Sequence, residues 1–379
     1  MALSLYLHFP FCRNLCGYCD FYKEKYDRKT VDDYLTALEI EIALAAGTVD
    51  ADRRRVETIY IGGGTPSLLS PEQLGSIITA ARNHFTLADD LEFTLEINPE
   101  TIDGDRLDAY RELGVNRPVF GVQSFDLGAL RLLSRRHRLD ETYRTVYLAR
   151  ALGFDNFGID MIFGLPRQTA GKLAADLAQV AELTPPHISY YQLTVEPGTP
   201  LERRVADSRL KLPGTDLCAA MYRGINAELK RFNYFRYEIS SYAQPGYECR
   251  HNLRYWEGGD FLGLGPSAHS YLGDRRFANM ASLDEYLKAI NNRQRPLVFD
   301  NAGDQSRLTE AIMLGLRTSR GIDRRGFRHR FGQALEKVID RDSYELLLKS
   351  GHIDDSEEYL RLTEAGLPLA DEIIRRLMK

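Results

Sequence analysis

Three cysteines lie close together near the start of the chain, at Cys12, Cys16 and Cys19. The spacing Cys-x3-Cys-x2-Cys is too dense for a disulfide framework in a chain of 379 residues, and thiolates are soft ligands that suit iron–sulfur clusters or zinc. Three thiolates can bind three irons of one cubane and leave the fourth iron open to another ligand. The alternative is a structural zinc site with a distant fourth ligand, because Cys16-x2-Cys19 alone is zinc-like.

A glycine-rich segment is the second feature that could do chemistry. Gly62-Gly63-Gly64-Thr65 follows a strand-like stretch, and glycine lets a backbone approach a ligand closely because it has no Cβ. A plain glycine-rich turn is the alternative. The segment is not a phosphate-binding P-loop, since no Gly-Lys-Ser/Thr follows it.

Segments with strand-like and helix-like patterns alternate in the first half of the chain. The expected strands are residues 4–9, 58–61, 92–97, 119–122, 157–163 and 188–193, and the expected helices include 31–46, 71–84, 105–113 and 143–152. This alternation predicts an α/β fold with a parallel sheet. Six βα units are too few for a closed eight-stranded barrel, so an open or partial barrel is expected. Pro118 counts against the fourth strand, because it cannot donate to a central ladder.

The fold positions these candidates together. In such barrels the site gathers at the C-terminal ends of the strands. The cysteines follow the first expected strand and the glycines follow the second. Glu96 lies at the end of the third strand, Gln123 just after the fourth and Asp160 within the fifth. Residues from distant parts of the chain are therefore expected at one edge of the sheet.

The rest of the chain has a different pattern. After residue 205 the βα alternation stops; residues 237–240 are expected to form one more strand, followed by a stretch from 244 to 266 rich in Gly and Pro. From residue 308 the chain looks mainly helical, with a turn at Ser350-Gly351 and a last helix over 367–378. We therefore divide the chain into residues 1–205, 206–305 and 306–379.

Composition excludes several classes of protein. The hydrophobic content is 44%, the charged content is 27% and the net charge is −5, so nothing favours nucleic acid or anionic lipid as a partner. No apolar run approaches the ~20 residues that span a bilayer, and the first residues do not look like a signal peptide. We expect a cytoplasmic protein whose thiols stay reduced.

The order of motifs resembles one known family. Tyr6-Leu7-His8-Phe9-Pro10-Phe11-Cys12-x3-Cys16-x2-Cys19-Asp20-Phe21 is similar to the opening of the oxygen-independent coproporphyrinogen dehydrogenases, which are radical S-adenosylmethionine (SAM) proteins, and most similar to their HemW-type heme-chaperone branch. The similarity continues through residues 61–67, 96–99, 121–125, 160–169, 191–199, 237–240 and 249–256. The resemblance implies a partial (β/α)6 barrel, a small C-terminal domain of winged-helix type, and a [4Fe–4S] cluster on the three cysteines.

The resemblance also implies a SAM site. In the family, the segment matching Gly63, Gly64 and Thr65 contacts the methionyl part of SAM, and Tyr18 would pack on the adenine. Other positions that match residues lining or contacting SAM are Tyr6, Glu96, Gln123, Arg135 and Asp160. A guanidinium such as that of Arg135 suits the SAM carboxylate. The alternative for each polar residue is an ordinary strand-end residue or a surface ion pair.

The motif His251-Asn252-x2-Tyr255-Trp256 marks the heme-binding branch. Imidazole is a good ligand for heme iron, and aromatic residues can stack on a porphyrin. Cys249 and His269 are rival ligands. The alternative is a structural motif in which His251 satisfies buried backbone groups and Trp256 packs in a domain interface.

Two functions compete. The first is a heme chaperone that binds a [4Fe–4S] cluster, SAM and heme and transfers heme to an acceptor protein, with a one-electron donor such as flavodoxin or ferredoxin. The second is an oxygen-independent coproporphyrinogen III dehydrogenase that uses a 5′-deoxyadenosyl radical. The dehydrogenase pattern has a further cysteine where this chain has Phe21, and a longer segment before the cluster. We therefore expect the chaperone; reductive SAM cleavage stays open, and dehydrogenase activity is doubtful.

Overall fold

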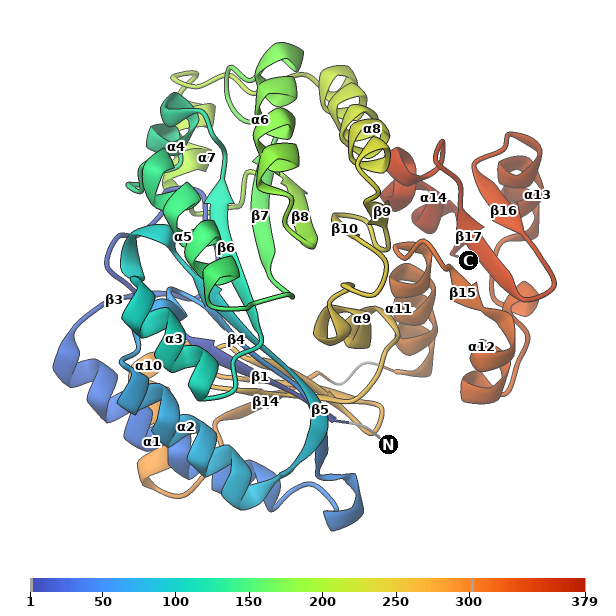
Figure 1. The fold of residues 1–379 in the computed structure, drawn as a ribbon. Coiled ribbons are helices and arrows are strands. Elements are labelled where there is room, and N and C mark those ends of the chain that lie inside the picture. The colour runs from blue at the N-terminus through green and yellow to red at the C-terminus, as the bar shows by residue number, and fades with distance from the viewer. Residues whose placement is uncertain (1–2, 301–302, 379) are drawn as a thin grey trace.

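The computed structural model describes residues 3–300 and 303–378, most of them built around one curved sheet of twelve strands (Figure 1). Six parallel strands form its centre, in the order β1-β4-β5-β6-β7-β8. Their bounds are β1 Leu3–Phe9, β4 Arg55–Gly63, β5 Thr86–Ile97, β6 Arg117–Gln123, β7 Gly158–Phe163 and β8 His187–Gln192. The predicted strands and the open parallel barrel are confirmed. Pro118 lies within β6, in register with Leu95 of β5.

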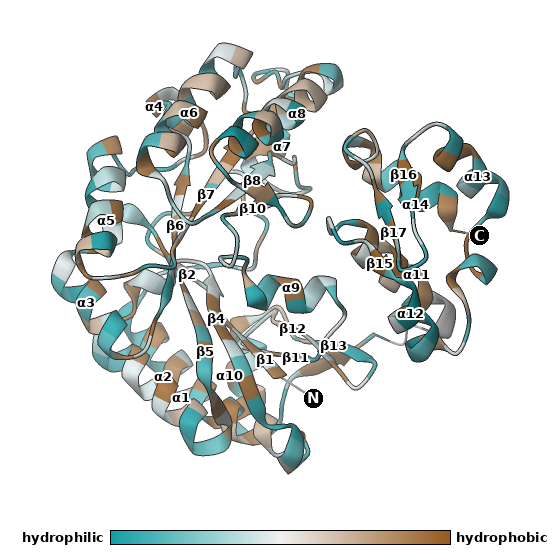
Figure 2. Cartoon of the chain, turned by 45° about the vertical axis from the view of Figure 1, so that its right-hand side comes forward, coloured by the Kyte–Doolittle hydropathy of each residue, from teal (hydrophilic) through white to brown (hydrophobic). Residues whose placement is uncertain are grey.

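Helices cover the convex outer face of this sheet (Figure 1). Those of the barrel are α1 Arg28–Ala46, α2 Pro71–His84, α3 Gly104–Glu112, α4 Leu127–Leu132, α5 Leu139–Ala151, α6 Ala170–Leu183, α7 Pro200–Ala206 and α8 Thr215–Arg231. Their starts follow from capping residues: Ser70 and Gln73 form a reciprocal capping box at α2. Apolar residues of these helices and of the strands form the main core, and Figure 2 shows brown, hydrophobic colour along β4 to β7.

The region after residue 205 extends the same sheet at both edges. On one side β11 Phe261–Leu264 pairs in parallel with β1, followed by β12 His269–Leu272, β13 Arg275–Asn279 and β14 Leu297–Phe299. On the other side β10 Ser241–Ala243 and β9 Phe235–Arg236 continue from β8. The sequence pattern did not predict these short strands. The division at residues 205 and 305 stays a prediction.

The strand predicted at residues 237–240 is wrong. β9 ends before these residues and β10 begins after them. Within them, Glu238 makes only an isolated bridge to Thr318, and its carboxylate accepts the backbone N–H of Ser240 at 3.1 Å. A side chain that bonds to the backbone two residues ahead favours a turn over a ladder.

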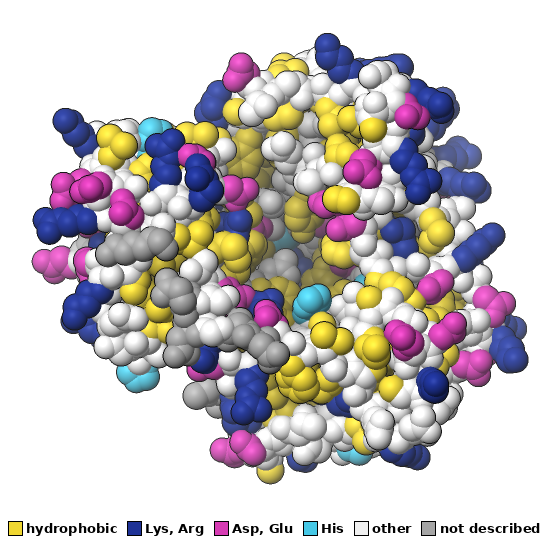
Figure 3. Space-filling model, turned by 180° about the vertical axis from the view of Figure 1, so that it is seen from behind, with side chains coloured by type: hydrophobic (Ala, Val, Ile, Leu, Met, Phe, Trp, Pro, Cys, Tyr) yellow, Lys and Arg dark blue, Asp and Glu magenta, His cyan; other side chains and the backbone are white. Residues whose placement is uncertain are grey.

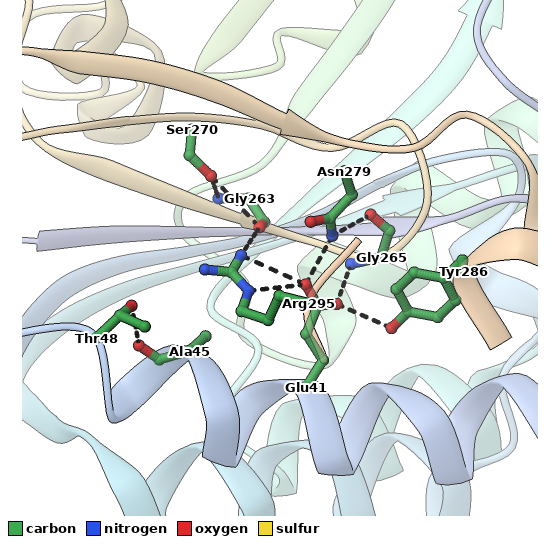
Figure 4. Close-up of polar contacts among 9 residues, drawn as sticks. All are labelled: Glu41, Ala45, Thr48, Gly263, Gly265, Ser270, Asn279, Tyr286 and Arg295. Carbon is green, nitrogen blue, oxygen red and sulfur yellow. Dashed lines mark hydrogen bonds and ion pairs between the residues drawn. The ribbon is translucent and has the colours of Figure 1, made fainter. Parts of the chain in front are cut away.

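A buried carboxylate ties the β11 edge to α1 (Figure 4). Glu41 of α1 is fully buried and accepts hydrogen bonds from the backbone N–H of Gly265 at 2.7 Å, from Asn279 at 2.6 Å and from the Tyr286 hydroxyl at 2.8 Å. Arg295 completes the site as its ion-pair partner at 3.4 Å. Tyr286 belongs to α10, Leu283–Asn291. This network holds the added strands and α10 against the barrel.

The C-terminal part folds around a second hydrophobic core. It contains helices α11 Asp304–Leu316, α12 Arg324–Phe331, α13 Arg341–Lys349 and α14 Ala370–Leu377, and the small antiparallel sheet of β15 Ile322–Asp323, β17 Tyr359–Leu362 and β16 Ile353–Asp355. This order of helices with a short hairpin agrees with the winged-helix expectation. The expected last helix is a 3-10 turn, Leu367–Leu369, continued by α14. Among the described residues, no helix has both the length and the apolar character needed to cross a membrane.

Candidate functional site

A cavity of about 450 Å³ opens where the parallel strands end, and it brings most of the predicted residues together. Those that line it are Cys12, Cys16, Tyr18, Cys19, Gly63, Gly64, Thr65, Glu96, Gln123, Arg135 and Asp160. Tyr6 and His251 are absent from the lining. Seen from the side opposite to Figure 1, the molecule is hollowed at its centre, with hydrophobic side chains around the hollow (Figure 3).

The three cysteines come from a loop held by a two-stranded ladder. β2, Phe11–Cys12, pairs with β3, Glu24–Lys25, so the chain between them is closed at its base. Burial raises the pKa of Cys12 to about 11 and also raises the pKa of Cys19. The free thiols of Cys12 and Cys19 are therefore protonated at neutral pH, and a bound metal centre is needed to hold these two as thiolates.

The donor set fits a cubane better than a single ion. Within residues 3–300 and 303–378, no three His, Cys, Asp or Glu side chains converge where one metal ion could bind. A cubane does not need such convergence, because each thiolate binds a different iron. Cys12 is nearly buried, Cys16 and Cys19 are partly exposed, and all three line one cavity. These cysteines would hold the [4Fe–4S] cluster.

The glycines at the end of β4 are required by their neighbours. A Cβ on Gly63, whose φ is +110°, would lie 2.5 Å from the His8 ring, and one on Gly64 would lie 2.7 Å from the carbonyl oxygen of Phe11. Strand β4 thus passes directly against the end of β1 and the cysteine loop. Close packing on protein atoms explains these glycines, and contact of their backbone with SAM stays a prediction.

Glu96 is the carboxylate at the centre of the cavity wall. Its Oε1 accepts from the Tyr60 hydroxyl at 2.9 Å and its Oε2 accepts from the backbone N–H of Gly63 at 3.1 Å. Burial, and then the negative charge of Asp160, raise the pKa of Glu96 to about 7. Burial raises the pKa of Asp160 to about 6, against the opposing effect of a hydrogen bond with Ser189. The two carboxylic acids share a buried region in which both are readily protonated.

Arg135 supplies the positive charge. One of its Nη atoms donates to Asn98 Oδ1 at 2.7 Å and to the carbonyl oxygen of Gly121 at 2.8 Å, while its buried Nε has no partner. Asn98 in turn donates to Thr65, and Thr65 donates to the Cys12 sulfur at 3.5 Å. A guanidinium with a free N–H beside a cavity fits a carboxylate ligand. Asn98 and Tyr60 also line the cavity, and the site prediction left them out, although Asn98 stands in the Glu-Ile-Asn-Pro block.

Gln123 ends β6 at an irregularity. The register with β7 shifts between Gly121 and Gln123, and Gln123 has a φ of +68°. Such left-handed conformations of non-glycine residues cluster at functional sites. Asp176 of α6 holds the following turn, because its carboxylate accepts from the Ser124 hydroxyl at 3.0 Å and from the Phe125 N–H at 2.9 Å.

Tyr6 lies behind the cavity. Its hydroxyl bonds to His8 Nδ1 at 3.0 Å, and His8 Nε2 bonds to the carbonyl oxygen of Tyr22 at 2.8 Å. Because a carbonyl only accepts, Nε2 carries the proton and Nδ1 accepts from Tyr6. Tyr6 therefore acts here on the cysteine loop, through His8, and not on the cavity.

The three candidate heme ligands differ in access. His251 and Cys249 are fully buried, whereas His269 at the start of β12 is exposed. Both ring nitrogens of His251 are engaged, Nδ1 with Thr58 at 2.7 Å and Nε2 with Tyr255 at 2.6 Å. The Cys249 thiol bonds to Glu92 at 3.6 Å. Ligation of heme iron by His251 or Cys249 would require these buried contacts to break.

Comparison with known proteins gives the family. Residues 6–180 match the radical SAM superfamily and residues 304–369 match the HemN C-terminal domain. The heme chaperone HemW of Bacillus subtilis is 35% identical over 373 residues, covering 98% of this chain and 97% of the relative. HemW of Escherichia coli is 42% identical over 272 residues, covering 70% and 69%.

Among solved structures, the coproporphyrinogen III oxidase HemN of Escherichia coli, a radical SAM enzyme, superposes with a TM-score of 0.83 at 27% identity, covering 99% of this chain and 89% of that one. The fold and the order of domains are therefore those of HemN, whereas HemW proteins of Bacillus subtilis and Mycobacterium tuberculosis match over nearly the whole chain at 35% identity. The chain belongs to the HemW family of radical SAM proteins.

Proposed function

We propose that this protein is a heme chaperone that holds a [4Fe–4S] cluster and SAM in the barrel cavity, binds heme and passes it to an acceptor protein. The observation that carries the proposal is the convergence of three cysteines, Arg135 and two carboxylic acids on one cavity, in a chain that matches named heme chaperones over nearly its full length. The relatives are known by that function, and the cavity supplies the chemistry that the cofactors need.

Different residues of the cavity would bind the cluster and SAM. Cys12, Cys16 and Cys19 would hold the cluster, and the free Nε of Arg135 would take the SAM carboxylate. Asp160 and Gln123, which line the same cavity, would bind the ribose hydroxyls or the amino group of SAM, and Glu96 would be a further contact. Bound together, the reduced cluster and SAM supply one-electron chemistry at the sulfonium.

For heme we propose His269 as the iron ligand. Among the three candidates it is the one with an exposed imidazole. The strand register shows which face of the sheet His269 occupies. Tyr271 pairs with Phe261, and Phe261 pairs with Ser4, whose side chain is on the inner face of β1, so all three share that face. Residues two apart on a strand share a face, so His269 belongs to the inner face as well, beside Gly263. Burial and the nearby Arg276 lower the pKa of His269, which favours the neutral, metal-binding imidazole.

The dehydrogenase function is the second candidate. The fold is that of HemN, but Phe21 stands where the dehydrogenase pattern has a further cysteine, and its side chain is 65% exposed at the mouth of the cavity. A side chain that cannot bind metal at this position favours the chaperone.

Two assays on anaerobically reconstituted protein test the proposal. Heme titration should saturate at about one heme per chain, with a Soret band that shifts in a His269→Ala variant and not in a His84→Ala variant, which changes another exposed histidine. Incubation with coproporphyrinogen III, SAM and a reductant should give no protoporphyrinogen IX, while a known dehydrogenase run alongside does. Product at a comparable rate, or no heme binding, would contradict the chaperone function.

The partners and location belong to the same proposal. We propose a heme-accepting protein as the recipient and a one-electron donor such as a flavodoxin or ferredoxin as the reductant. A cytoplasmic location fits the reduced thiols that the cluster requires.

A further inference from the structure

The inner face of the barrel is polar from its base to the cavity. Residues in register on neighbouring parallel strands point to the same face. One such row contains Tyr6, Tyr60, Thr94 and Arg117, and its side chains lie between the base of the barrel and the cavity lined by Glu96. Within this row the Tyr60 hydroxyl donates to Glu96, whereas Thr94 Oγ1 and two nitrogens of Arg117 are buried without a protein partner.

The segment of residues 249–256, which contains α9 Arg250–Trp256, closes the base of this interior. Glu92 of β5 caps the start of the segment: its Oε2 accepts from the Arg250 N–H and its Oε1 from the His251 N–H, both at 2.9 Å. Arg254 pairs with Glu57 of β4 at 2.8 Å. The segment is therefore fixed to two barrel strands, and it inserts His251 between them.

The hydrogen bonds of His251 define its state. Thr58 donates its hydroxyl proton to Ser4, so toward His251 it can only accept. Nδ1 of His251 therefore carries the proton, and Nε2 accepts from the Tyr255 hydroxyl at 2.6 Å. The imidazole is neutral, and neither nitrogen is open to a metal.

The ring of His251 packs on the residue that holds Glu96. The centroids of His251 and Tyr60 lie 5.1 Å apart, and the Tyr60 hydroxyl donates to Glu96 Oε1 at 2.9 Å. The other oxygen of Glu96 is bound by the Gly63 N–H. A continuous set of contacts thus runs from the base of the barrel to the carboxylate on the cavity wall.

We infer that His251 is a positioning residue for the SAM pocket: it fixes the Tyr60 ring, and Tyr60 fixes the carboxylate of Glu96. This inference rests on the proposed SAM site in the cavity. It gives the His-Asn-x2-Tyr-Trp motif a role in SAM binding in place of a role in binding heme iron. The motif acts through the barrel interior, by way of Tyr60, which itself lines the cavity beside Glu96.

The test uses anaerobically reconstituted full-length protein. Calorimetry measures the SAM affinity, and electron paramagnetic resonance measures the change in the cluster's spectrum when SAM is added. Heme titration measures the heme stoichiometry. Tyr60→Phe keeps the ring and removes only the bond to Glu96, and His251→Ala removes the ring support. Each should raise the SAM dissociation constant about three- to tenfold, the worth of roughly one hydrogen bond, and alter the SAM-induced spectral change. Heme stoichiometry should stay the same.

Arg250→Gln is the matched control on the same segment. It removes an exposed ion pair with Asp90 and should leave the SAM dissociation constant, the spectral change and the heme stoichiometry as in the wild type.

A double variant separates positioning from general damage. If His251 acts through Tyr60, the two changes together should weaken SAM binding no more than the larger single change, because coupled sites are not additive. Additive losses, or unchanged SAM affinity in His251→Ala, would overturn the inference, as would loss of heme with SAM binding intact. If His251→Ala does not fold, Tyr255→Phe, which removes only the bond at Nε2, takes its place. Wild-type protein that binds SAM but no heme would defeat the chaperone proposal and leave this inference standing on the SAM data.

Discussion

The carboxylate of Glu92 accepts the backbone N–H of His251 at 2.9 Å, joining the middle of β5 to a segment 159 residues later in the chain. The same carboxylate accepts the N–H of Arg250, so both of its oxygens hold the first turn of α9. Glu92 is 5% exposed. A buried carboxyl group in this position is tolerated because both of its oxygens accept hydrogen bonds, and these bonds attach the start of the motif to the barrel.

Replacing Glu92 should loosen this attachment. Glu92→Ala removes the acceptor of two backbone hydrogen bonds, one buried and one partly buried, so we expect the free energy of unfolding to fall by about 3 kcal/mol. Trp256 is the one tryptophan in the sequence and lies in the attached segment, so its fluorescence during urea denaturation reports the loss directly. Asp90→Asn, which weakens the exposed pair with Arg250, is the control and should cost less than about 1 kcal/mol. Equal effects of the two changes would contradict the role of Glu92.

The pattern of the sequence predicted the central barrel because apolar strand segments alternate there with helices, several of which begin at clear capping residues. The same reasoning failed where strands are very short. β11 lies in a stretch rich in Gly and Pro, with Gly263 inside the strand, and it is in place because Glu41 binds the N–H of Gly265 from 224 residues away. No local pattern contains that information.

The cavity residues were predicted through motifs, and the contacts between them were not. In the sequence, Tyr60 and Thr58 look like ordinary strand residues. In the structure both lie on the inner face of β4, where Tyr60 contacts Glu96 and Thr58 contacts His251. Sequence reasoning placed His251 near heme because imidazole is a good iron ligand. The two hydrogen bonds that occupy its ring appear only when β4 and α9 come together.

Breaking the buried ion pair of Glu41 and Arg295 should destabilise the protein far more than breaking an exposed ion pair. Removing one partner leaves the other buried and unpaired, so Arg295→Ala or Glu41→Ala should each lower the free energy of unfolding by about 3–5 kcal/mol. Arg341→Ala breaks an exposed helical pair with Glu345 and should cost about 0.5 kcal/mol or less. Chemical denaturation of the three variants provides the comparison. Small and similar effects would show that the network in Figure 4 does not hold the β11 edge.

The cluster should depend on each of the three loop cysteines and on no other. Anaerobic reconstitution should give about four iron and four sulfide per chain, and Cys16→Ala should lose the intact [4Fe–4S] cluster. Cys218→Ala is the matched control, because Cys218 is a buried cysteine of α8 that does not line the cavity. Iron and sulfide analysis with absorption spectroscopy measures the outcome. Zinc bound in place of iron, or a full cluster in Cys16→Ala, would contradict the assignment.

The two carboxylic acids of the cavity should make stability depend on pH. The pKa of Glu96 is raised to about 7 and that of Asp160 to about 6, whereas unfolded Glu and Asp titrate near ~4.3 and ~3.9. Between these values the folded chain holds protons that the unfolded chain has released, so the contribution is full below about pH 4 and is lost as the pH rises through about 6 and 7. The free energy of unfolding of the cofactor-free protein should therefore decrease from pH 5 to pH 8. Gln has no titratable proton, so Glu96→Gln should flatten the fall between about pH 5 and 7, while Glu345→Gln on the surface should leave it unchanged. Urea denaturation across this range checks the slope, and an equally steep fall in Glu96→Gln would show that Glu96 is not the group that titrates.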